Sequence, residues 1–306
     1  MKLYKYMSQD VRLEFIKNPL LRITPQQCLN DPFECLPSNS VKNDINRLLK
    51  SNSVPVKDSD TFFNDLNSFI SMHGIISLSE SPDNLLMWSH YADEHRGIVV
   101  EFEVDEDNPF DLFITDIVPE SSDAKFGRVS YRKARKYPYN INNDSIGPIR
   151  DYYYLSKSDE WIYEKEYRFI TPFTMANYLL CNKKNPHWQK AFKAAGLPLP
   201  IEDSSQSYVK SNLLIHKEAL FASWFHSHNT GALFLTNVNS QRICKVILGV
   251  KSDTEKFISS MKKYESEDPY RTYYSSFTDK FINVEQADID PDRYELVFND
   301  LNKKTR

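Results

Sequence analysis

Scarcity of glycine is the feature that most limits the folds open to this chain. Its 306 residues include seven glycines, against 19 phenylalanines and 18 tyrosines. The glycines form neither a GxGxxG nor a GxxxxGK[ST] pattern, the loops that hold nucleotide phosphates in Rossmann and P-loop proteins. The sequence therefore argues against both architectures, and a nucleotide ligand would have to bind without a glycine-rich loop.

Short alternating runs separated by helical patterns predict an α+β fold. The run 98–104 (IVVEFEV) places Ile98, Val100, Phe102 and Val104 on one face of a strand. Further strands are predicted at 2–6, 20–24, 74–79, 127–131, 161–173, 244–250, 280–289 and 293–298. We expect them to form a sheet of mixed direction that is interrupted by helices.

Helices are predicted at 11–16, 60–72, 187–195 and 216–228. Ser81-Pro82 predicts the start of another helix, ending near Gly97, because serine caps helices and proline suits the first helical position. Ser252 and Glu255 predict a capping box at the start of a helix that follows strand 244–250. No linker or repeat divides the chain, so we expect a single domain over 1–306, with a helical insertion around 175–240.

Charge and cysteine usage bear on partners and compartment. The chain has 38 basic and 42 acidic residues and a net charge of −4, so charge alone does not indicate nucleic acid as a partner, although a local basic patch would allow it. No apolar stretch approaches the roughly 20 residues of a membrane span, and no membrane partner is expected. The four cysteines form no CxxC pair, and the N-terminus does not resemble a signal peptide, which indicates a cytoplasmic protein.

The stretch 161–173 (WIYEKEYRFITPF) carries the most informative polar pattern. As a strand, it places Glu164, Glu166 and Arg168 on one face, with the two carboxylates about 7 Å apart at the backbone. We expect the arginine to keep one carboxylate ionised, while partial burial raises the pKa of the other. Such a pair can orient a ribose hydroxyl or stabilise a cationic transition state, and an exposed, charged strand face is the alternative.

Other predicted strands carry two serines and an arginine. Ser77 and Ser79 share a face of strand 74–79, where short hydroxyl groups can shape a ligand pocket or simply pack closely. Arg22, on strand 20–24, has a guanidinium that can bind a phosphate or carboxylate through two hydrogen bonds, or form a surface ion pair.

The loop after strand 20–24 contains a turn signal, Asn30-Asp31-Pro32. Together with Glu34 it offers an amide and two carboxylates, which suit a ligand-binding rim, a metal site or a well-formed turn. Elsewhere the metal-binding patterns are weak, because His90 and His95 diverge on a helix. We therefore expect no resident metal.

The segment 84–104 combines aromatic and polar residues just before a strand. On a helix, its side chains fall into two groups: Trp88, Tyr91 and His95, and separately Met87, His90 and Glu94. Trp88 and Tyr91 offer flat faces for stacking on a purine or nicotinamide ring. His90 or His95 can exchange a proton near neutral pH or be a hydrogen-bonded core residue. We expect this helix to line a cavity that faces the acidic strand.

Several motifs together resemble an uncharacterised bacterial family that is defined as a domain of unknown function. They are LYKY (3–6), NDPFE (30–34), SLSE (77–80), MWSHYAD (87–93), WIYEKEYR (161–168), KVILGV (245–250) and YELVF (294–298). The resemblance spans Leu3 to about Phe298. It implies one conserved unit that is often associated with phage defence, and no established reaction.

The order of the strand motifs is also similar to that of mono-ADP-ribosyltransferases. That family has an Arg or His on an early strand, a Ser-Thr-Ser-like strand in the middle and a QxE or ExE strand later. The matching positions here are Arg22 or Lys5-Tyr6, then Ser77-Leu78-Ser79, then Glu164-Lys165-Glu166. Leu78 stands where the family has threonine, and the first-strand histidine of related LYHYT motifs is absent, which puts the nicotinamide clamp in doubt.

This second resemblance implies a largely antiparallel, split sheet and NAD as the substrate. Glu166 would hold the nicotinamide-ribose hydroxyl, Glu164 would polarise the acceptor, and Arg22 would bind the diphosphate. The expected catalytic residues are Glu164, Glu166 and Arg168. The expected NAD-binding residues are Tyr4, Lys5, Tyr6, Arg22, Asn30, Asp31, Glu34, Ser77, Ser79, Trp88, His90 and Tyr91.

Two other functions stay open. One is a metal-dependent nuclease, in which Asp31, Glu34, Glu164 and Glu166 would bind Mg²⁺. The other is a non-catalytic sensor that binds a nucleotide or a phage protein at the aromatic segment around Trp88. The sequence does not name a macromolecular acceptor.

Overall fold

The computed structural model describes residues 1–51, 59–115, 124–141, 146–182, 190, 193, 208–212, 221, 223–267 and 283–301. Its helices are α1 (Gln9–Lys17), α2 (Asn39–Ser51), α3 (Ser59–Ser71), α4 (Leu85–Tyr91), α5 (Ile146–Tyr154), α8 (Ser227–Thr230) and α9 (Thr254–Glu267). Its strands are β1 (Lys2–Met7), β2 (Leu20–Pro25), β3 (His73–Ser79), β4 (Ile98–Glu103), β5 (Phe113–Ile114), β6 (Lys125–Arg128), β7 (Ser130–Arg132), β8 (Ser156–Ser158), β9 (Glu166–Pro172), β10 (Tyr178–Asn182), β11 (Tyr208–Asn212), β12 (Leu233–Val238), β13 (Ile243–Leu248), β14 (Asn283–Ile289) and β15 (Leu296–Asp300).

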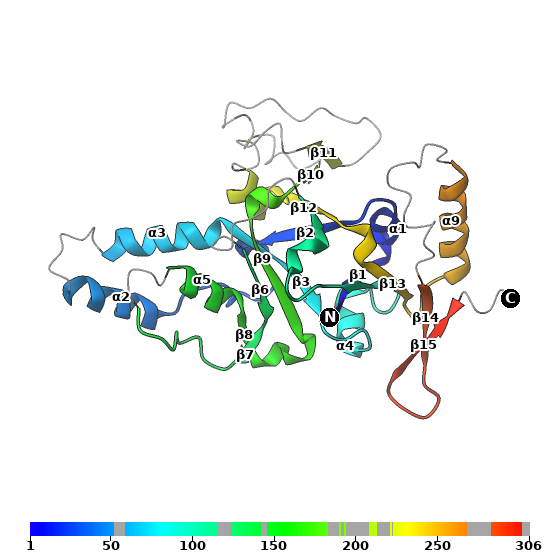
Figure 1. The fold of residues 1–306 in the computed structure, drawn as a ribbon, viewed down its shortest axis with the longest axis horizontal. Coiled ribbons are helices and arrows are strands. Elements are labelled where there is room, and N and C mark those ends of the chain that lie inside the picture. Colours follow the sequence, from blue (N-terminus) through cyan, green and yellow to red (C-terminus); the bar gives the residue numbers. More distant parts are fainter. Residues whose placement is uncertain are drawn as a thin grey trace.

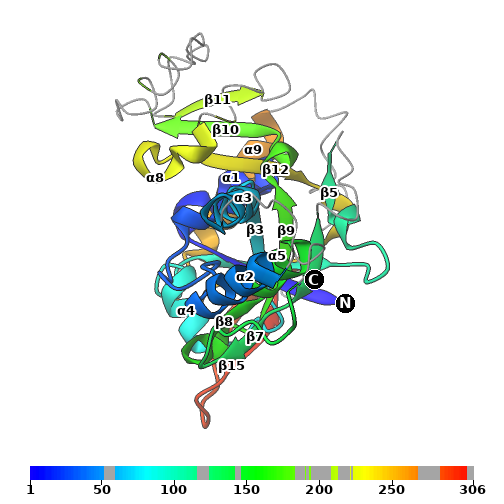
Figure 2. The ribbon, with the colours of Figure 1, turned by 90° about the vertical axis from the view of Figure 1, so that its left-hand side faces the viewer.

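Thirteen of the described strands form one sheet, and helices surround it (Figures 1 and 2). The main path runs β11-β10-β12-β2-β3-β1-β4-β13-β14-β15, and β5, β6 and β9 pair with strands along it. Most neighbours are antiparallel, whereas β13 and β14 are parallel. The predicted α+β class, with a sheet of mixed and mostly antiparallel direction, is confirmed.

The sheet divides at β3. The start of β3 pairs with β2, where Thr24 lies opposite Ile75, and its end pairs with β1, where Tyr4 lies opposite Ser79. On its other edge β3 pairs along its whole length with β9. Strands β1 and β2 therefore pair with different ends of the same edge of β3 and belong to different halves of the sheet. Ser77 lies between the two paired ends.

Successive side chains of β4 point to opposite faces of the sheet, and helices pack on both of these faces. Val100 faces α1 and α9 in the largest apolar cluster, together with Ile98, Phe102 and Val104 as predicted. Val99 faces the other way and packs against Trp88 of α4. Helix α4 is thereby held against the sheet beside β1.

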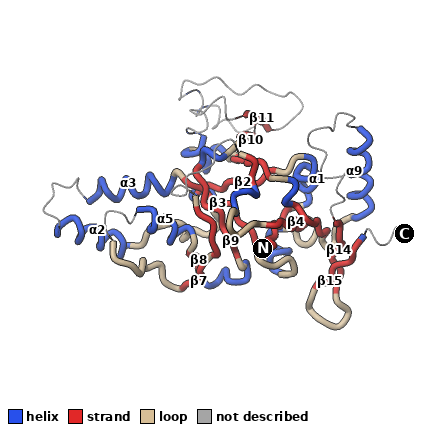
Figure 3. Tube along the Cα trace, viewed as in Figure 1, coloured by secondary structure: helices blue, strands red, loops and turns tan. Residues whose placement is uncertain are grey.

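A second group of helices covers β3 and β9. Val41 of α2, Ile70 of α3 and Ile149 of α5 form one apolar cluster with Ile75 and Ile170. Helices α2 and α3 lie side by side and extend away from the sheet (Figures 1 and 3). Residues two apart on a strand share a face, so Ser77 and Ser79 lie on the same face of β3 as Ile75. Arg168 and Glu166 likewise lie on the same face of β9 as Ile170.

The predicted helix from Ser81 to Gly97 is wrong at both ends. Asn84 caps α4 instead, because its side chain accepts hydrogen bonds from the amides of Leu86 and Met87 at 3.0 and 3.1 Å. The helix ends at Tyr91, and the next residues turn the chain back through positive φ values, the largest being 72° at His95.

The predicted strand 161–173 is wrong in its first part. Residues Asp159–Glu164 form a 3-10 helix, and Ser158 accepts a hydrogen bond from the amide of Glu160 at its start. Lys165 follows with a left-handed φ of 44°, and the strand begins only at Glu166. Glu164 and Glu166 are therefore not neighbours on one strand face.

Two smaller predictions also need correction. The strand expected at 127–131 is two strands, β6 and β7, with the buried Val129 between them. Asp253 rather than Ser252 caps α9, because its carboxylate accepts from the amide of Lys256 at 2.9 Å. The Ser252 hydroxyl accepts from Arg12 at 2.6 Å, so it is engaged elsewhere.

The segment 175–240, expected to be a helical insertion, contains three strands, β10, β11 and β12, in its described parts. They extend the sheet beyond β2. Residues 223–225 and α8 are helical, whereas the helix expected at 187–195 lies outside the described residues except for positions 190 and 193. None of the helices that the structure describes has the length and apolar composition needed to cross a bilayer.

Replacing Gly97 with alanine is expected to destabilise the protein by about 2–3 kcal/mol. A Cβ at Gly97 would lie 2.0 Å from the carbonyl oxygen of Met7 and 2.9 Å from that of Ala92, so backbone would have to move. The matched control is Gly147→Ala in α5, where a Cβ meets nothing within 4 Å and alanine favours the helix by up to about 1 kcal/mol. Urea denaturation of both variants gives the comparison, and equal unfolding midpoints would contradict the expectation.

Candidate functional site

A cavity of about 240 Å³ lies where β1 and β2 separate from β3. Residues of β1, β3 and β9 form its base, and Met87 and Tyr91 of α4 form one wall. The segment 28–30 and Glu34 add another wall, and Lys157 of β8 completes it. The cavity therefore combines side chains from segments that are far apart in the sequence.

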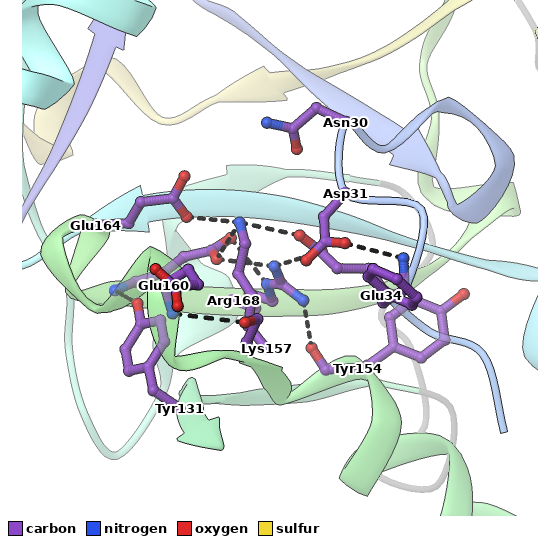
Figure 4. A network of polar contacts seen from close by, with 12 residues as sticks. Asn30, Asp31, Glu34, Tyr131, Tyr154, Lys157, Glu160, Glu164 and Arg168 are labelled. Atoms are coloured by element: carbon purple, nitrogen blue, oxygen red, sulfur yellow. Dashed lines mark hydrogen bonds and ion pairs between the residues drawn. The ribbon is translucent and has the colours of Figure 1, made fainter. Parts of the chain in front are cut away.

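Three carboxylates and two cations form a buried charge network beside this cavity (Figure 4). The carboxylates are those of Glu34, Glu164 and Glu166, and the cations are Lys157 and Arg168. All five side chains are 6% exposed or less. A cluster of charges this deeply buried is stable only if each charge finds partners.

Every guanidinium nitrogen of Arg168 donates at least one hydrogen bond. Its Nε and Nη2 donate to the two carboxylate oxygens of Glu166, each at 2.8 Å, and Nη2 also donates to Glu34 at 2.6 Å. Its Nη1 donates to the backbone oxygen of Tyr154 at 2.8 Å. This fork-shaped contact fixes the position of the Glu166 carboxylate.

Lys157 lies at the centre of the network. Its Nζ is 2.6 Å from Glu164, 2.9 Å from Glu34 and 3.5 Å from Glu166. It also lies over the ring of Trp161, at 4.8 Å from the centroid. Lys157 was not predicted from the sequence, since a lysine between two serines forms no recognisable motif.

The two neighbouring glutamates have pKa values shifted in opposite directions. Burial by itself would raise the pKa of Glu166, but the charges of Arg168 and Lys157 outweigh burial and lower it to about 2. Burial raises the pKa of Glu164, with the charge of Glu166 adding to the effect and that of Lys157 only partly opposing it. The expectation of one ionised carboxylate and one with a raised pKa agrees with this geometry.

Glu164 reaches the network because of the turn that precedes β9. The Ser79 hydroxyl donates to the backbone oxygen of Glu164 at 2.8 Å, and the left-handed Lys165 separates Glu164 from the strand. The Tyr91 hydroxyl donates to the Glu164 carboxylate at 2.6 Å, and Asn30 donates to that hydroxyl at 3.2 Å. The carboxylate of Glu164 is thus positioned by α4 and by the loop containing Asn30.

Lys5 extends into the region where the sheet divides. Its Nζ donates to the backbone oxygen of Ser77 at 2.9 Å, and no described carboxylate lies within ion-pair distance of it. Removal from water lowers the pKa of Lys5, although the nearby charge of Glu166 opposes this. Lys5 is thus a cavity-lining cation that can bind an anionic or hydroxyl-bearing ligand.

Most of the predicted site residues lie together. Those that line the cavity are Tyr4, Lys5, Tyr6, Asn30, Glu34, Ser77, Ser79, Tyr91, Glu164, Glu166 and Arg168. Those that do not line it are Arg22, Asp31, Trp88 and His90.

Trp88 and His90 cannot contact a ligand in this cavity as expected. Trp88 is fully buried; its indole Nε1 donates to the backbone oxygen of Pro82 at 2.7 Å, and its ring stacks on His95 at 6.1 Å. His90 is exposed and lies beside the ring of Tyr163 at 6.3 Å. The face of α4 that meets the cavity instead carries Met87 and Tyr91, which are one turn apart.

Arg22 and Asp31 lie near the cavity without lining it. The Arg22 side chain has a buried Nε for which no hydrogen-bond partner is found in the described part of the chain. Asp31 accepts a hydrogen bond from the amide of Phe33 at 2.9 Å and lines a second cavity. The described residues include no group of three or more His, Cys, Asp or Glu side chains arranged to hold a metal ion.

Comparison with known proteins identifies one segment. Residues 87–169 match the model of a family described as "Protein of unknown function (DUF2971)". No curated protein and no solved structure matches the chain. A domain of unknown function therefore covers 87–169, a stretch that includes Tyr91, Lys157 and the segment from Glu164 to Arg168.

Proposed function

We propose that this protein cleaves the bond between nicotinamide and ribose in NAD and transfers ADP-ribose to an acceptor. The observation that carries the proposal is that two carboxylates in different surroundings line one cavity: Arg168 binds both oxygens of Glu166, whereas Tyr91 and Lys157 bind Glu164. These surroundings lower the pKa of Glu166 and raise that of Glu164. Neighbouring carboxylates of this kind can divide a reaction between a permanent anion and a group that exchanges a proton.

Glu166 supplies the permanent negative charge. Breaking the nicotinamide–ribose bond leaves positive charge on the ribose, and a fixed carboxylate stabilises that charge in the transition state. Arg168 and Lys157 keep Glu166 ionised and in place. Oε1 of Glu166 accepts a hydrogen bond from Arg168 Nε, and its second lone pair can accept one from a ribose hydroxyl.

Glu164 acts on the acceptor. The nicotinamide leaves with the electron pair of the broken bond, the acceptor atom forms a new bond to the same ribose carbon, and the acceptor's proton passes to Glu164. A carboxylate with a raised pKa is suited to take up that proton. Tyr91, which donates to Glu164 at 2.6 Å, positions it.

We expect the cavity to take one half of NAD. Its volume of about 240 Å³ is below the roughly 300–1,000 Å³ typical of ligand pockets, so it would enclose the nicotinamide and its ribose and leave the rest outside. Lys5 and Ser77 would bind ribose or phosphate oxygens, and the rings of Tyr4, Tyr6 and Tyr91 would flank the nicotinamide. The division of the sheet at β3 is consistent with an ADP-ribosyltransferase-like fold.

The resemblance of the motifs to a phage-defence family supports a role as a cytoplasmic toxin or abortive-infection effector. An enzyme that consumes NAD or modifies an essential macromolecule would halt both the host and the phage. The proposed role as an effector is based on the motif resemblance, whereas the proposed ADP-ribosyl transfer is based on the residues that line the cavity.

The geometry supports the two other functions less well. Three of the four carboxylates assigned to Mg²⁺ do converge, but Lys157 and Arg168 bind their oxygens, so a metal ion would have to displace a buried cation. Asp31, the fourth, lines the second cavity instead. A sensor that recognises its ligand through Trp88 is disfavoured because Trp88 is fully buried.

The full-length chain is expected to release nicotinamide from NAD. NAD labelled separately in the nicotinamide and in the adenylate half distinguishes hydrolysis from transfer, because the adenylate label ends either as free ADP-ribose or on an acceptor in added cell extract. A chelator should leave the rate unchanged. Folded protein that releases no nicotinamide, with or without extract, would refute the proposal.

A further inference from the structure

A second cavity, of about 230 Å³, shares the Glu34–Lys157 ion pair with the first, since both residues line both cavities. Its other walls include Asp31 and Phe33 of the segment after β2 and the segment 132–135 after β7. The reaction proposed above does not use this second cavity. Its chemistry differs from that of the first, because its rim is strongly basic.

The basic rim comes from a short run, YRKARKY (131–137), in a chain whose net charge is −4. Arg132, Lys133, Arg135 and Lys136 are all exposed. Among the described residues the only carboxylate within ion-pair distance of these four cations is Asp159, 4.0 Å from Lys133. The run therefore presents several cations that are available to phosphate groups.

Aromatic rings lie beside these cations. The guanidinium of Arg135 lies over the ring of Phe33 at 5.3 Å, and that of Arg132 over Tyr152 at 5.4 Å. Phe33 lines the second cavity although it is 60% exposed, which is unusual for a large apolar side chain. An exposed ring beside arginines, such as Phe33, is typical of surfaces that stack unpaired bases.

Asp31 adds a group that lacks a partner. It is 5% exposed and lines the cavity. One oxygen accepts from the Phe33 amide at 2.9 Å, whereas Oδ2 is buried without a hydrogen-bond partner in the described part of the chain. Leaving a buried carboxylate oxygen unpaired is costly, so this position favours a ligand that donates an N–H or O–H group.

We infer that the second cavity binds single-stranded nucleic acid. A base stacks on Phe33 and donates from its edge to Asp31, and the adjoining phosphates contact Arg132, Lys133 and Arg135. A duplex does not fit this arrangement, because its base edges are paired and its rings are stacked on each other. Because the two cavities share Glu34 and Lys157, the bound strand would lie next to the NAD site as the ADP-ribose acceptor, a step that rests on the proposed function.

The test measures binding without NAD, so that it stands apart from turnover. A fluorescently labelled single-stranded DNA of mixed sequence is titrated with the full-length protein at several salt concentrations. The triple variant R132Q/K133Q/R135Q is expected to bind at least about tenfold more weakly and to lower the salt slope by about two, since each phosphate contact contributes about 0.7. The matched control is K251Q/K256Q/R293Q, which removes three exposed cations elsewhere and should bind like the wild type.

A second pair of variants tests the base contact. Phe33→Ala is expected to weaken binding about tenfold, whereas Tyr294→Ala, at a 99% exposed ring, should have no effect. An oligonucleotide with abasic sites should bind more weakly than the intact strand. Equal binding of the abasic strand, of a duplex or of polyglutamate would overturn the inference, because each would show simple attraction of polyanions.

The two proposals can fail separately. Strand binding that persists in a protein without NAD turnover would leave the second cavity's role intact and remove the proposed reaction. Nicotinamide release by a protein that binds no single strand would support the proposed reaction and remove the proposed role of the second cavity.

Discussion

Nicotinamide release from NAD is expected to fall about 100- to 1000-fold when Glu166 is replaced by glutamine. The substitution keeps the shape of the side chain and removes the negative charge of a carboxylate that Arg168 and Lys157 keep ionised. If this charge stabilises the ribosyl cation, its loss raises the barrier directly. The measurement is the initial rate of nicotinamide release at saturating NAD.

The control is Glu160→Gln, which removes a carboxylate from the exposed part of the preceding 3-10 helix. It should retain the wild-type rate. Because Glu166 is buried, the unfolding midpoint of the variant and its thermal shift with NAD must show that it folds and binds. Full activity in a folded Glu166→Gln variant would remove Glu166 from the reaction.

The pH dependence separates the two carboxylates. Glu166, with a pKa of about 2, stays ionised throughout the working range. Glu164 must be ionised to accept a proton, and its pKa is raised, so the transfer rate should increase as the pH rises through that pKa. Glu164→Gln should lower the rate and abolish this increase.

Replacing Lys157 with methionine is expected to reduce the free energy of unfolding by about 3–5 kcal/mol at neutral pH. The variant leaves the three carboxylates around Lys157 with Arg168 as the one remaining cation among them. Among the described residues, Glu164 loses its only ion-pair partner and keeps one hydrogen bond to its carboxylate, from Tyr91. Chemical denaturation monitored by tryptophan fluorescence gives the difference.

The loss of stability should depend on pH in a definite direction. The pKa of Glu164 is already raised in the folded protein, and removing the ammonium raises it further. A group whose folded-state pKa is raised favours folding below its unfolded pKa, and that contribution is lost as the pH rises through the folded pKa. The deficit should therefore be smaller at about pH 5 than at about pH 7.5.

The control is Lys256→Met on the exposed face of α9, where a change within about 0.5 kcal/mol is expected. Equal stability of the Lys157→Met variant and the wild type would mean that water, rather than Lys157, compensates the carboxylates.

The strands that could be predicted are those in which burial imposes a regular period. Residues 98–104 alternate because one face meets α1 and α9, and the prediction of that face is confirmed. In 161–173 the same alternation was misleading before Glu166. The side chain of Glu164 binds Lys157, and its backbone oxygen accepts a hydrogen bond from Ser79. Contacts of this kind produce no periodic pattern of apolar residues in the local sequence.

Residues of the candidate cavity could be predicted where their types suggest a chemical role. Glu166 and the serines of β3 were found in this way, and they do line one cavity. The orientation of α4 could not be predicted, because helical spacing groups residues without showing which group meets the sheet. Trp88 therefore lies in the core, whereas Tyr91 reaches the cavity.

The division of the sheet at β3 limits how the protein can be cut into working pieces. Glu34 lies 134 positions before its partner Arg168, and Lys5 and Ser77 also precede Met87, where the segment with a family match begins. An excised fragment of residues 87–169 would keep Glu164, Glu166 and both network cations, but would lack β1, β2 and β3 against which they are assembled. Dissection at the borders of that match would thus remove part of the cavity lining and the Glu34–Arg168 ion pair, so a fragment that keeps the whole cavity must begin at or before β1.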